Sequence, residues 1–203
     1  MLAGSAVAAG AVLPAGTEPQ FKGQSVSHAV QALARWAFTD GDAGGRPFAV
    51  VDKLGARLYV FTAAGHLAGS TPALLGQQRG DNTTPGVGDR VATGIPMAQR
   101  TTPAGRFASE PGRNLQGEAV VWVDYDAAVA VHRLRPAAAA ERRPQRLASA
   151  TPADNQITLG CIVVAGDFYD RVVAPLLGKH RGTVYVLPDS QDWREAFPNA
   201  AGL

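Results

Sequence analysis

The segment Thr158–Ile162 reads Thr-Leu-Gly-Cys-Ile and holds the single cysteine of a 203-residue chain. It lies between a β-like run and a helix-like one. A lone cysteine forms no internal disulfide and no cysteine-rich zinc site, so Cys161 is either a small buried side chain or a nucleophile. Burial is the commoner use of a free cysteine. The preceding Gly160 favours the nucleophile, because glycine lets the backbone turn tightly and approach a substrate closely.

A histidine that could activate this cysteine lies upstream. His132 belongs to the β-branched run Val129–Leu134, which predicts a strand that would hold the imidazole rigidly. A single cysteine with a histidine elsewhere in the chain is the pattern of a Cys–His catalytic pair. We interpret the other three histidines as structural or solvated; they are His28, His66 and His180.

Hydrophobic periodicity predicts a mainly β (α+β) domain with two helices. One helix should begin at a Ser25 cap and run to about Phe38. The other should run from Asp167 to Leu177, with Phe168, Val172, Pro175 and Leu176 facing the core. Strands are expected at 48–52 and 57–62, within 69–75, and at 120–124, 129–134, 157–164 and 183–187.

The chain divides into four parts by composition. Residues 1–20 resemble a secretory signal or a disordered leader, with a small-residue site at Ala6-Val7-Ala8, and predict export to the periplasm or cell envelope. An N-terminal helix and linker (21–46), the main domain (47–188) and a C-terminal tail (189–203) follow. Within the main domain, residues 77–89 predict a mobile surface loop and residues 136–154 an insertion or long loop.

Charge and motif content exclude several classes of function. The formal net charge is +2, with 46% hydrophobic and 18% charged residues, which is typical of a globular domain. No basic stripe with interleaved aromatics points to nucleic acid. No second apolar segment is long enough for a membrane span. Dinucleotide, phosphate-loop and zinc-protease motifs are also absent from the sequence.

Three motifs in order resemble those of the L,D-transpeptidase catalytic domain, also called the YkuD domain. They are the run Thr102–Phe107 (Thr-Pro-Ala-Gly-Arg-Phe), the strand residue His132, and Thr158–Ile162 around the cysteine. The resemblance covers roughly residues 47–188. It implies an L,D-transpeptidase-like β-sandwich or barrel with the cysteine and histidine on adjacent strand ends, and neither a metal nor an organic cofactor.

The chain departs from the family pattern near the expected site. Leu159 stands where family members usually have a histidine, and Arg133 follows the strand histidine in place of glycine or serine. Val163 replaces the arginine or asparagine usual two residues after the cysteine. The stretch between His132 and Cys161 is also longer than usual.

The resemblance implies acyl transfer on peptidoglycan stem peptides. His132 would take the proton of Cys161, and the thiolate would displace D-alanine and form a thioacyl-enzyme. The backbone N–H groups of Gly160 and Cys161 would stabilise the oxyanion, with Thr158 in the same motif. An amine from a stem peptide or a protein would resolve the thioester, or water would, which makes the site a hydrolase. The ordinary pKa of histidine predicts a titrating group near neutrality.

Substrate recognition must use other residues, because Val163 offers no polar contact. Arg142, Arg143 and Arg146 could bind a peptide carboxylate bidentately, although a solvated loop is the simpler reading of such a cluster. Arg133 is also a candidate for substrate binding but the weakest of the four, since side chains alternate along a strand and it should point to the face opposite His132. The apolar motif positions also leave open a non-catalytic cell-wall-binding relative.

Overall fold

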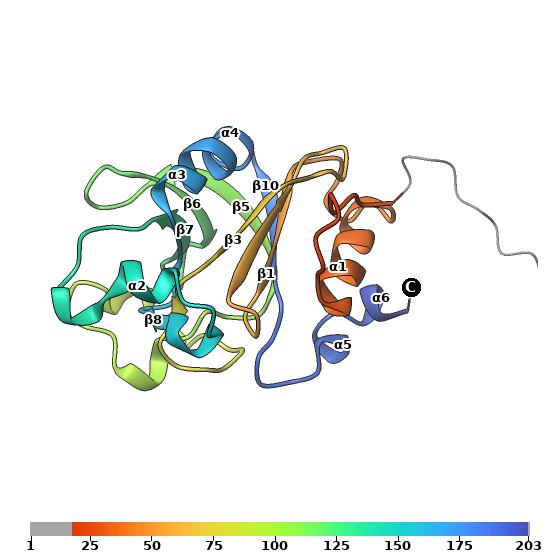
Figure 1. Cartoon of the computed structure of the whole chain (residues 1–203). Coiled ribbons are helices and arrows are strands. Elements are labelled where there is room, and N and C mark those ends of the chain that lie inside the picture. Colours follow the sequence, from red (N-terminus) through yellow and green to blue (C-terminus); the bar gives the residue numbers. More distant parts are fainter. Residues whose placement is uncertain (1–17, 203) are drawn as a thin grey trace, which may run out of the picture.

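The computed structural model describes residues 18–202, so the predicted leader with its Ala6-Val7-Ala8 site lies outside the described residues. One bent eight-stranded sheet dominates the molecule (Figure 1). The strands run, in spatial order, as β3 (Leu67–Pro72), β2 (Arg57–Phe61), β1 (Phe48–Asp52), β10 (Gly182–Val186), β5 (Gly105–Arg113), β6 (Ala119–Asp124), β7 (Val129–Arg133) and β9 (Ile162–Val164).

The two edges of this sheet are linked. A bridge between Leu74, just after edge strand β3, and Val163 in edge strand β9 joins them. A small parallel pair of β4 (Leu75–Gly76) and β8 (Gln156–Thr158) continues the join. The sheet is therefore nearly closed, and the expected mainly β fold of sandwich or barrel type is confirmed.

Two apolar clusters stabilise the sheet from opposite sides. The cluster inside the sheet contains β-branched residues of six strands together with Tyr169, Val173 and Leu177. The second cluster lies between the other face of β1, β2 and β10 and the helix α1 (His28–Phe38). β7 and β9, which adjoin the candidate cysteine and histidine, lie at the end of the strand order opposite to β1 and β2, so α1 supports the sheet away from the candidate site.

Helix α1 forms on the predicted face but begins later than predicted. Its cap is Ser27, whose hydroxyl accepts a hydrogen bond from the backbone of Val30, where the sequence suggested Ser25. Both serines can cap, and the one that aligns the apolar stripe with the sheet is used. The four buried residues are those expected, namely Val30, Leu33, Ala34 and Ala37.

The expected C-terminal tail is folded. Asp192 caps the short helix α5 (Trp193–Ala196), and α6 (Pro198–Ala201) follows it. Phe197 and Ala200 are buried in the cluster under α1, and Figure 1 shows both helices beside α1. Apolar side chains every three to four residues supply the burial that a tail lacks. Helix α1 and the C-terminal helices thus belong to the same packed unit as the sheet.

The helix predicted from Asp167 forms, but its most deeply buried residues are not the ones expected. It consists of α3 (Gly166–Phe168), a π-helical stretch (Tyr169–Val173) and α4 (Ala174–Leu176). The wider π turn shifts the phase, so that Tyr169, Val173 and Leu177 are fully buried. Of the predicted core residues, Phe168, Val172 and Leu176 are partly buried and pack against the same cluster, while Pro175 is exposed. Pro175 has no N–H to donate, which fits the irregular turn before it.

The two predicted loops differ in structure. Residues 77–89 are irregular until the 3₁₀ turn Gly88–Arg90, and a second 3₁₀ turn follows at Met97–Gln99. Residues 136–154 are partly helical: α2 (Arg143–Leu147) lies between the 3₁₀ turns Ala139–Glu141 and Pro152–Asn155. Leu147 of α2 is buried, which anchors this segment to the domain.

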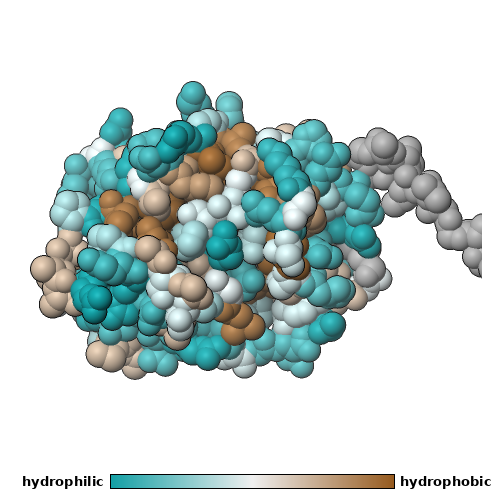
Figure 2. Space-filling model, viewed as in Figure 1, coloured by the Kyte–Doolittle hydropathy of each residue, from teal (hydrophilic) through white to brown (hydrophobic). Residues whose placement is uncertain are grey.

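On the face drawn in Figure 2, hydrophilic residues predominate and the hydrophobic patches are small and separated. No helix among residues 18–202 has the length and apolarity needed to cross a membrane.

Replacement of Leu33 by alanine should test the role of α1. Leu33 is fully buried between α1 and the sheet, so the substitution should lower the free energy of unfolding by about 2–5 kcal/mol. Urea unfolding of the variant measures this, with the exposed Gln31→Ala as the matched helix control. Equal stability of the two variants would show that α1 does not stabilise the sheet.

Candidate active site

The register of two parallel strands brings the predicted catalytic side chains to one face. His132 of β7 pairs with Val163 of β9. Side chains two residues apart on a strand share a face, so Cys161 points to the same side as Val163 and His132. Among residues 18–202, no hydrogen bond joins the Cys161 thiol to the ring. Such bonds are often long without substrate and tighten when it binds.

A hydrogen bond fixes the orientation and tautomer of His132. Its Nδ1 lies 2.7 Å from the backbone carbonyl oxygen of Arg133. A carbonyl only accepts, so Nδ1 carries the proton and Nε2 keeps a free lone pair. This is the tautomer that a general base at Nε2 requires.

Burial keeps the imidazole neutral. Only 8% of His132 is exposed, and burial lowers its pKa to about 4. The hydrogen bond to the Arg133 carbonyl and the charge of Glu118 oppose this effect, while the cations Arg135 and Arg143 add to it. His132 is therefore uncharged at pH 7, and its titration moves from the expected range near neutrality to about pH 4.

The thiol of Cys161 is also held in its neutral form. The residue as a whole is partly exposed, but burial of the thiol raises its pKa. Backbone hydrogen bonding at Ala130 and the charges of Arg135 and Arg143 act in the opposite sense with smaller effect. Sγ lies 3.4 Å from the Ala128 carbonyl, to which a thiol can donate. The resting site thus holds a neutral thiol and a neutral imidazole on one face.

The backbone before the cysteine is possible only with glycine. Gly160 has a φ of +137°, and a Cβ there would lie 2.7 Å from the backbone oxygen of Thr101. The Thr158 hydroxyl accepts from the Gly160 N–H at 3.2 Å and donates to the Cys161 carbonyl at 2.7 Å. Thr158 therefore holds the turn. The Gly160 N–H, one of the two expected oxyanion donors, is engaged with Thr158 in this conformation.

The motif at Thr102 reaches the same turn from another part of the chain. The Thr102 hydroxyl donates to the Gly160 carbonyl at 2.8 Å and accepts from the Gly76 N–H at 2.9 Å. Thr102 is 2% exposed. The sequence identified this motif only by its resemblance. Its structural role is to fix the backbone immediately before Cys161.

An apolar cover lies beside the candidate pair. Val163, Leu74 and Leu147 form a buried cluster, and Cys161 packs against it. Helix α2 reaches this face through Leu147. Leu159, the other apolar departure from the family motif, is 41% exposed on the turn. Val163 thus serves to seal the join of the sheet, where a polar side chain would have no partner.

The predicted substrate-binding arginines separate into different environments. Arg133 points away from His132: its Nε donates to Asp170 at 2.8 Å, and its guanidinium lies 4.3 Å from the centre of the Tyr169 ring. Arg142 is exposed and has a φ of +49° at the start of α2. Arg143 is partly buried and donates to Glu141 at 2.5 Å.

Two arginines act on both members of the candidate pair. The charges of Arg143 and Arg135 lower the pKa of His132 and that of Cys161, which indicates that both cations lie near the site. Arg135 forms an ion pair with Glu118 at 2.6 Å. Sequence reasoning did not single out Arg135, because nothing local distinguishes it from the other arginines nearby.

The two described cavities lie elsewhere. One of about 370 Å³ lies between the start of α1, the β1–β2 turn and α5, and includes Asp52, Leu54 and Trp193. A polar one of about 80 Å³ is lined by Arg57 and Asn155, among others. Among residues 18–202, no group of three or more His, Cys, Asp and Glu side chains could hold a metal ion.

Comparison with known proteins finds a likeness among solved structures. The sequence matches no family model and no curated protein. Among solved structures, the chain is similar to the LD transpeptidase LdtMt1 in complex with imipenem, with a TM-score of 0.41 and 18% sequence identity. The alignment covers 70% of this chain and 58% of that one, so this chain spans less than two thirds of its length.

Acidification should destabilise the fold through His132. The folded-state pKa of about 4 lies below the ordinary 6.5, so the unfolded chain binds the proton more readily between these values. The resulting stabilisation is fully present above pH 6.5 and is lost as the pH falls through 4. At 1.36 kcal/mol per pKa unit it amounts to roughly 3 kcal/mol.

The measurement is the free energy of unfolding from pH 7.5 to 4 in the wild type and in His132→Leu. The wild type should lose stability more steeply than the variant across this range, because the variant lacks the titrating ring. Parallel curves would show that His132 is accessible to protons in the folded state.

Proposed function

We propose that this chain is a cysteine-dependent acyltransferase of the L,D-transpeptidase type that acts on peptidoglycan stem peptides. The proposal is supported above all by the tautomer of His132, whose Nδ1 is bonded to the Arg133 carbonyl and whose Nε2 is free on the face of Cys161. The order of the three sequence motifs supports the substrate class. The proposed catalytic residues are Cys161 and His132, with Gly160 and Thr158 positioning the thiol.

The neutral resting state suggests how the reaction starts. His132 Nε2 takes the proton of Cys161 as Sγ attacks the carbonyl of the diaminopimelate–D-alanine bond. The Cys161 N–H stabilises the oxyanion in this proposal, since the Gly160 N–H is engaged with Thr158. The imidazolium then gives its proton to the leaving amine of D-alanine, and a thioester remains on Cys161.

The second half of the reaction distinguishes two activities at the same site. Attack by an amine from a second stem peptide, or from a protein, forms a new amide, restores the thiol and makes the chain a transpeptidase. Attack by water makes it a carboxypeptidase or a cross-link hydrolase. Both use His132 as the base for the incoming nucleophile. Export to the periplasm or cell envelope, where peptidoglycan is located, is part of the proposal.

A non-catalytic cell-wall-binding role is the competing function. It is favoured by the apolar packing of Cys161 against Val163 and Leu147, which is typical of a structural cysteine. It does not account for the tautomer of His132 or for the three polar contacts that fix the turn before Cys161.

Incubation with a carbapenem, followed by mass spectrometry of the intact protein, separates these functions. The wild type should acquire one covalent adduct on Cys161, and Cys161→Ser should acquire none, because the serine hydroxyl is far less ionised. His132→Ala should be acylated about 10²–10⁴-fold more slowly, the usual contribution of a positioned general base. Wild-type protein free of adduct would support the binding role.

Replacement of single arginines should distinguish an arginine that binds the substrate from one that is only solvated. Arg143→Ala should raise the Michaelis constant for anionic stem peptides more than it lowers turnover, since ground-state binding is lost. Arg142→Ala is the matched control, because Arg142 is exposed and adjacent in sequence. The difference should shrink with added salt. Identical Michaelis constants for the two variants would remove Arg143 from substrate recognition.

A further inference from the structure

The ammonium group of Lys53 is buried in the turn between β1 and β2. Its side chain is 2% exposed. An ammonium has three donors, and three hydrogen bonds use them all. The acceptors are the Gly80 carbonyl at 2.6 Å, Asp81 Oδ1 at 2.7 Å and the Thr102 carbonyl at 2.9 Å, with Asp189 Oδ1 forming a further ion pair at 3.2 Å.

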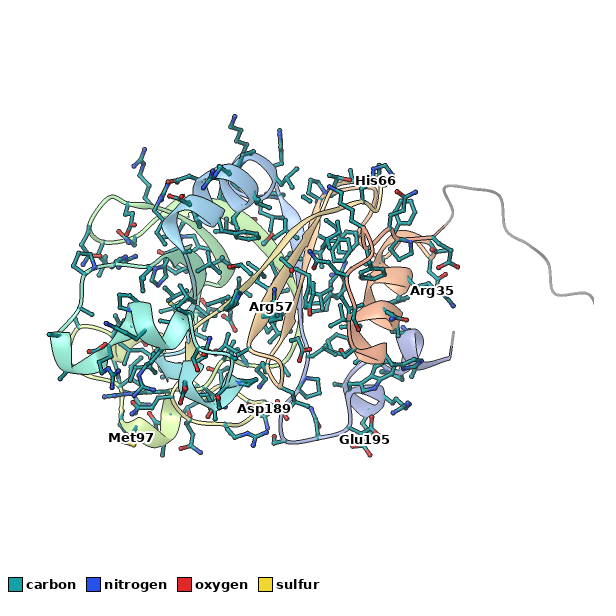
Figure 3. The ribbon with its side chains drawn as sticks, in the orientation of Figure 1. Arg35, Arg57, His66, Met97, Asp189 and Glu195 are labelled. Carbon is teal, nitrogen blue, oxygen red and sulfur yellow. The ribbon has the colours of Figure 1, made fainter. Side chains whose placement is uncertain are left out.

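The carboxylate of Asp81 accepts hydrogen bonds from further donors. Asp81 accepts from the N–H of Asp189 at 2.8 Å, from the N–H of Ser190 at 3.0 Å and from the Ser190 hydroxyl. Burial pushes the pKa of Asp81 upward, but the hydrogen bonds from Lys53, Ser190 and Asp189 outweigh it, so the pKa lies well below its usual range. Figure 3 shows Asp189 near the end of the β1–β2 hairpin, beside the C-terminal segment.

The hydrogen bond from Lys53 to the Thr102 carbonyl is not required to neutralise the ammonium charge. Asp81 and Asp189 already neutralise the ammonium, and Arg79 pairs with Asp189 at 3.8 Å, so the formal charges of the cluster sum to about zero. The contact with the Thr102 carbonyl therefore adds nothing to neutralisation. It fixes the backbone of Thr102 against the turn after β1.

Thr102 carries this constraint to the cysteine. Its carbonyl accepts from Lys53, while its hydroxyl donates to the Gly160 carbonyl at 2.8 Å. The backbone of Thr101 also packs so closely on Gly160 that no Cβ fits there. A displacement of Thr102 must therefore move Gly160, and with it the residue that follows.

We propose that Lys53 is a positioning residue for Cys161, acting through the backbone and hydroxyl of Thr102 on the turn at Gly160. In this role Lys53 touches no substrate. It keeps the Cys161 thiol in its buried orientation on the face of His132. The expected effect of Lys53 on acylation rests on the proposed function, in which Cys161 is the nucleophile. The expected effect of Lys53 on the pKa of the thiol does not depend on any reaction.

The thiol itself reports on this role, because Cys161 is the single cysteine of the chain. The rate of alkylation by iodoacetamide as a function of pH gives the pKa of Cys161 without competing signals. The charged groups that act on this thiol are Arg135 and Arg143, and His132 shares its face. None of these groups is changed in the variants below.

The variants are Lys53→Met, Thr102→Val and the double variant, with Leu33→Ala as a control for loss of stability on the other side of the sheet. Lys53→Met and Thr102→Val should each lower the alkylation midpoint by about one pH unit, because water reaches the loosened turn and burial no longer raises the thiol pKa as far. The double variant should match the single ones, since both act through the same contact. Leu33→Ala should retain the wild-type midpoint.

A wild-type midpoint in Lys53→Met, or a shift in the double variant equal to the sum of the single shifts, would overturn the positioning role. If Lys53→Met does not fold, Asp189→Asn takes its place and should give the same order of midpoints. Carbapenem acylation, measured on the same proteins, should fall at least tenfold in the Lys53 variant. Acylation absent from the wild type contradicts the proposed function alone, since the alkylation midpoints still decide the role of Lys53.

Discussion

The hydrogen bond from the Thr102 hydroxyl to the Gly160 carbonyl is the contact on which the candidate site depends. It joins two motifs that lie far apart in the sequence, and it does so where the nearly closed sheet brings β9 back toward β3. The residue at position 160 must be glycine, because a Cβ there would clash with the backbone of Thr101. Without this contact the turn before Cys161 would be held by Thr158 alone, and Thr158 belongs to the turn itself.

Electrostatics then determine the chemistry available to the pair. Burial favours the neutral forms of His132 and Cys161, because it lowers the pKa of the imidazole and raises that of the thiol. A preformed thiolate–imidazolium ion pair is therefore disfavoured at rest, and in the proposed reaction proton transfer would accompany attack. The nearby cations Arg135 and Arg143 favour the thiolate once it forms, and they would also favour an anionic substrate. The apolar cover by Val163 and Leu147 contributes to the burial.

The sequence predicted most of the strands, because β-branched alternation is a local signal. It missed β5, and it treated residues 157–164 as one strand where β8 and β9 are separated by the turn at Gly160. Its motifs also led to the prediction that His132 and Cys161 form a pair, and the strand register gives the two residues a common face. It misplaced the cap of α1, since Ser25 and Ser27 are equally good caps, and it missed the phase of the helix after Ala165, where a π turn overrides the regular period. Lys53 carried no signal at all. Its partners come from segments 27 to 136 residues away, and only the fold brings them together.

The central claim is that His132 offers a free Nε2 to Cys161 in the resting protein. Nitrogen-15 NMR of histidine-labelled protein at pH 7 tests it directly, because protonated and unprotonated ring nitrogens have distinct shifts and only four histidines contribute. The assigned His132 ring should be neutral, with the proton on Nδ1, and should remain so to well below pH 6. A proton on Nε2, or a charged ring at pH 7, would contradict the account.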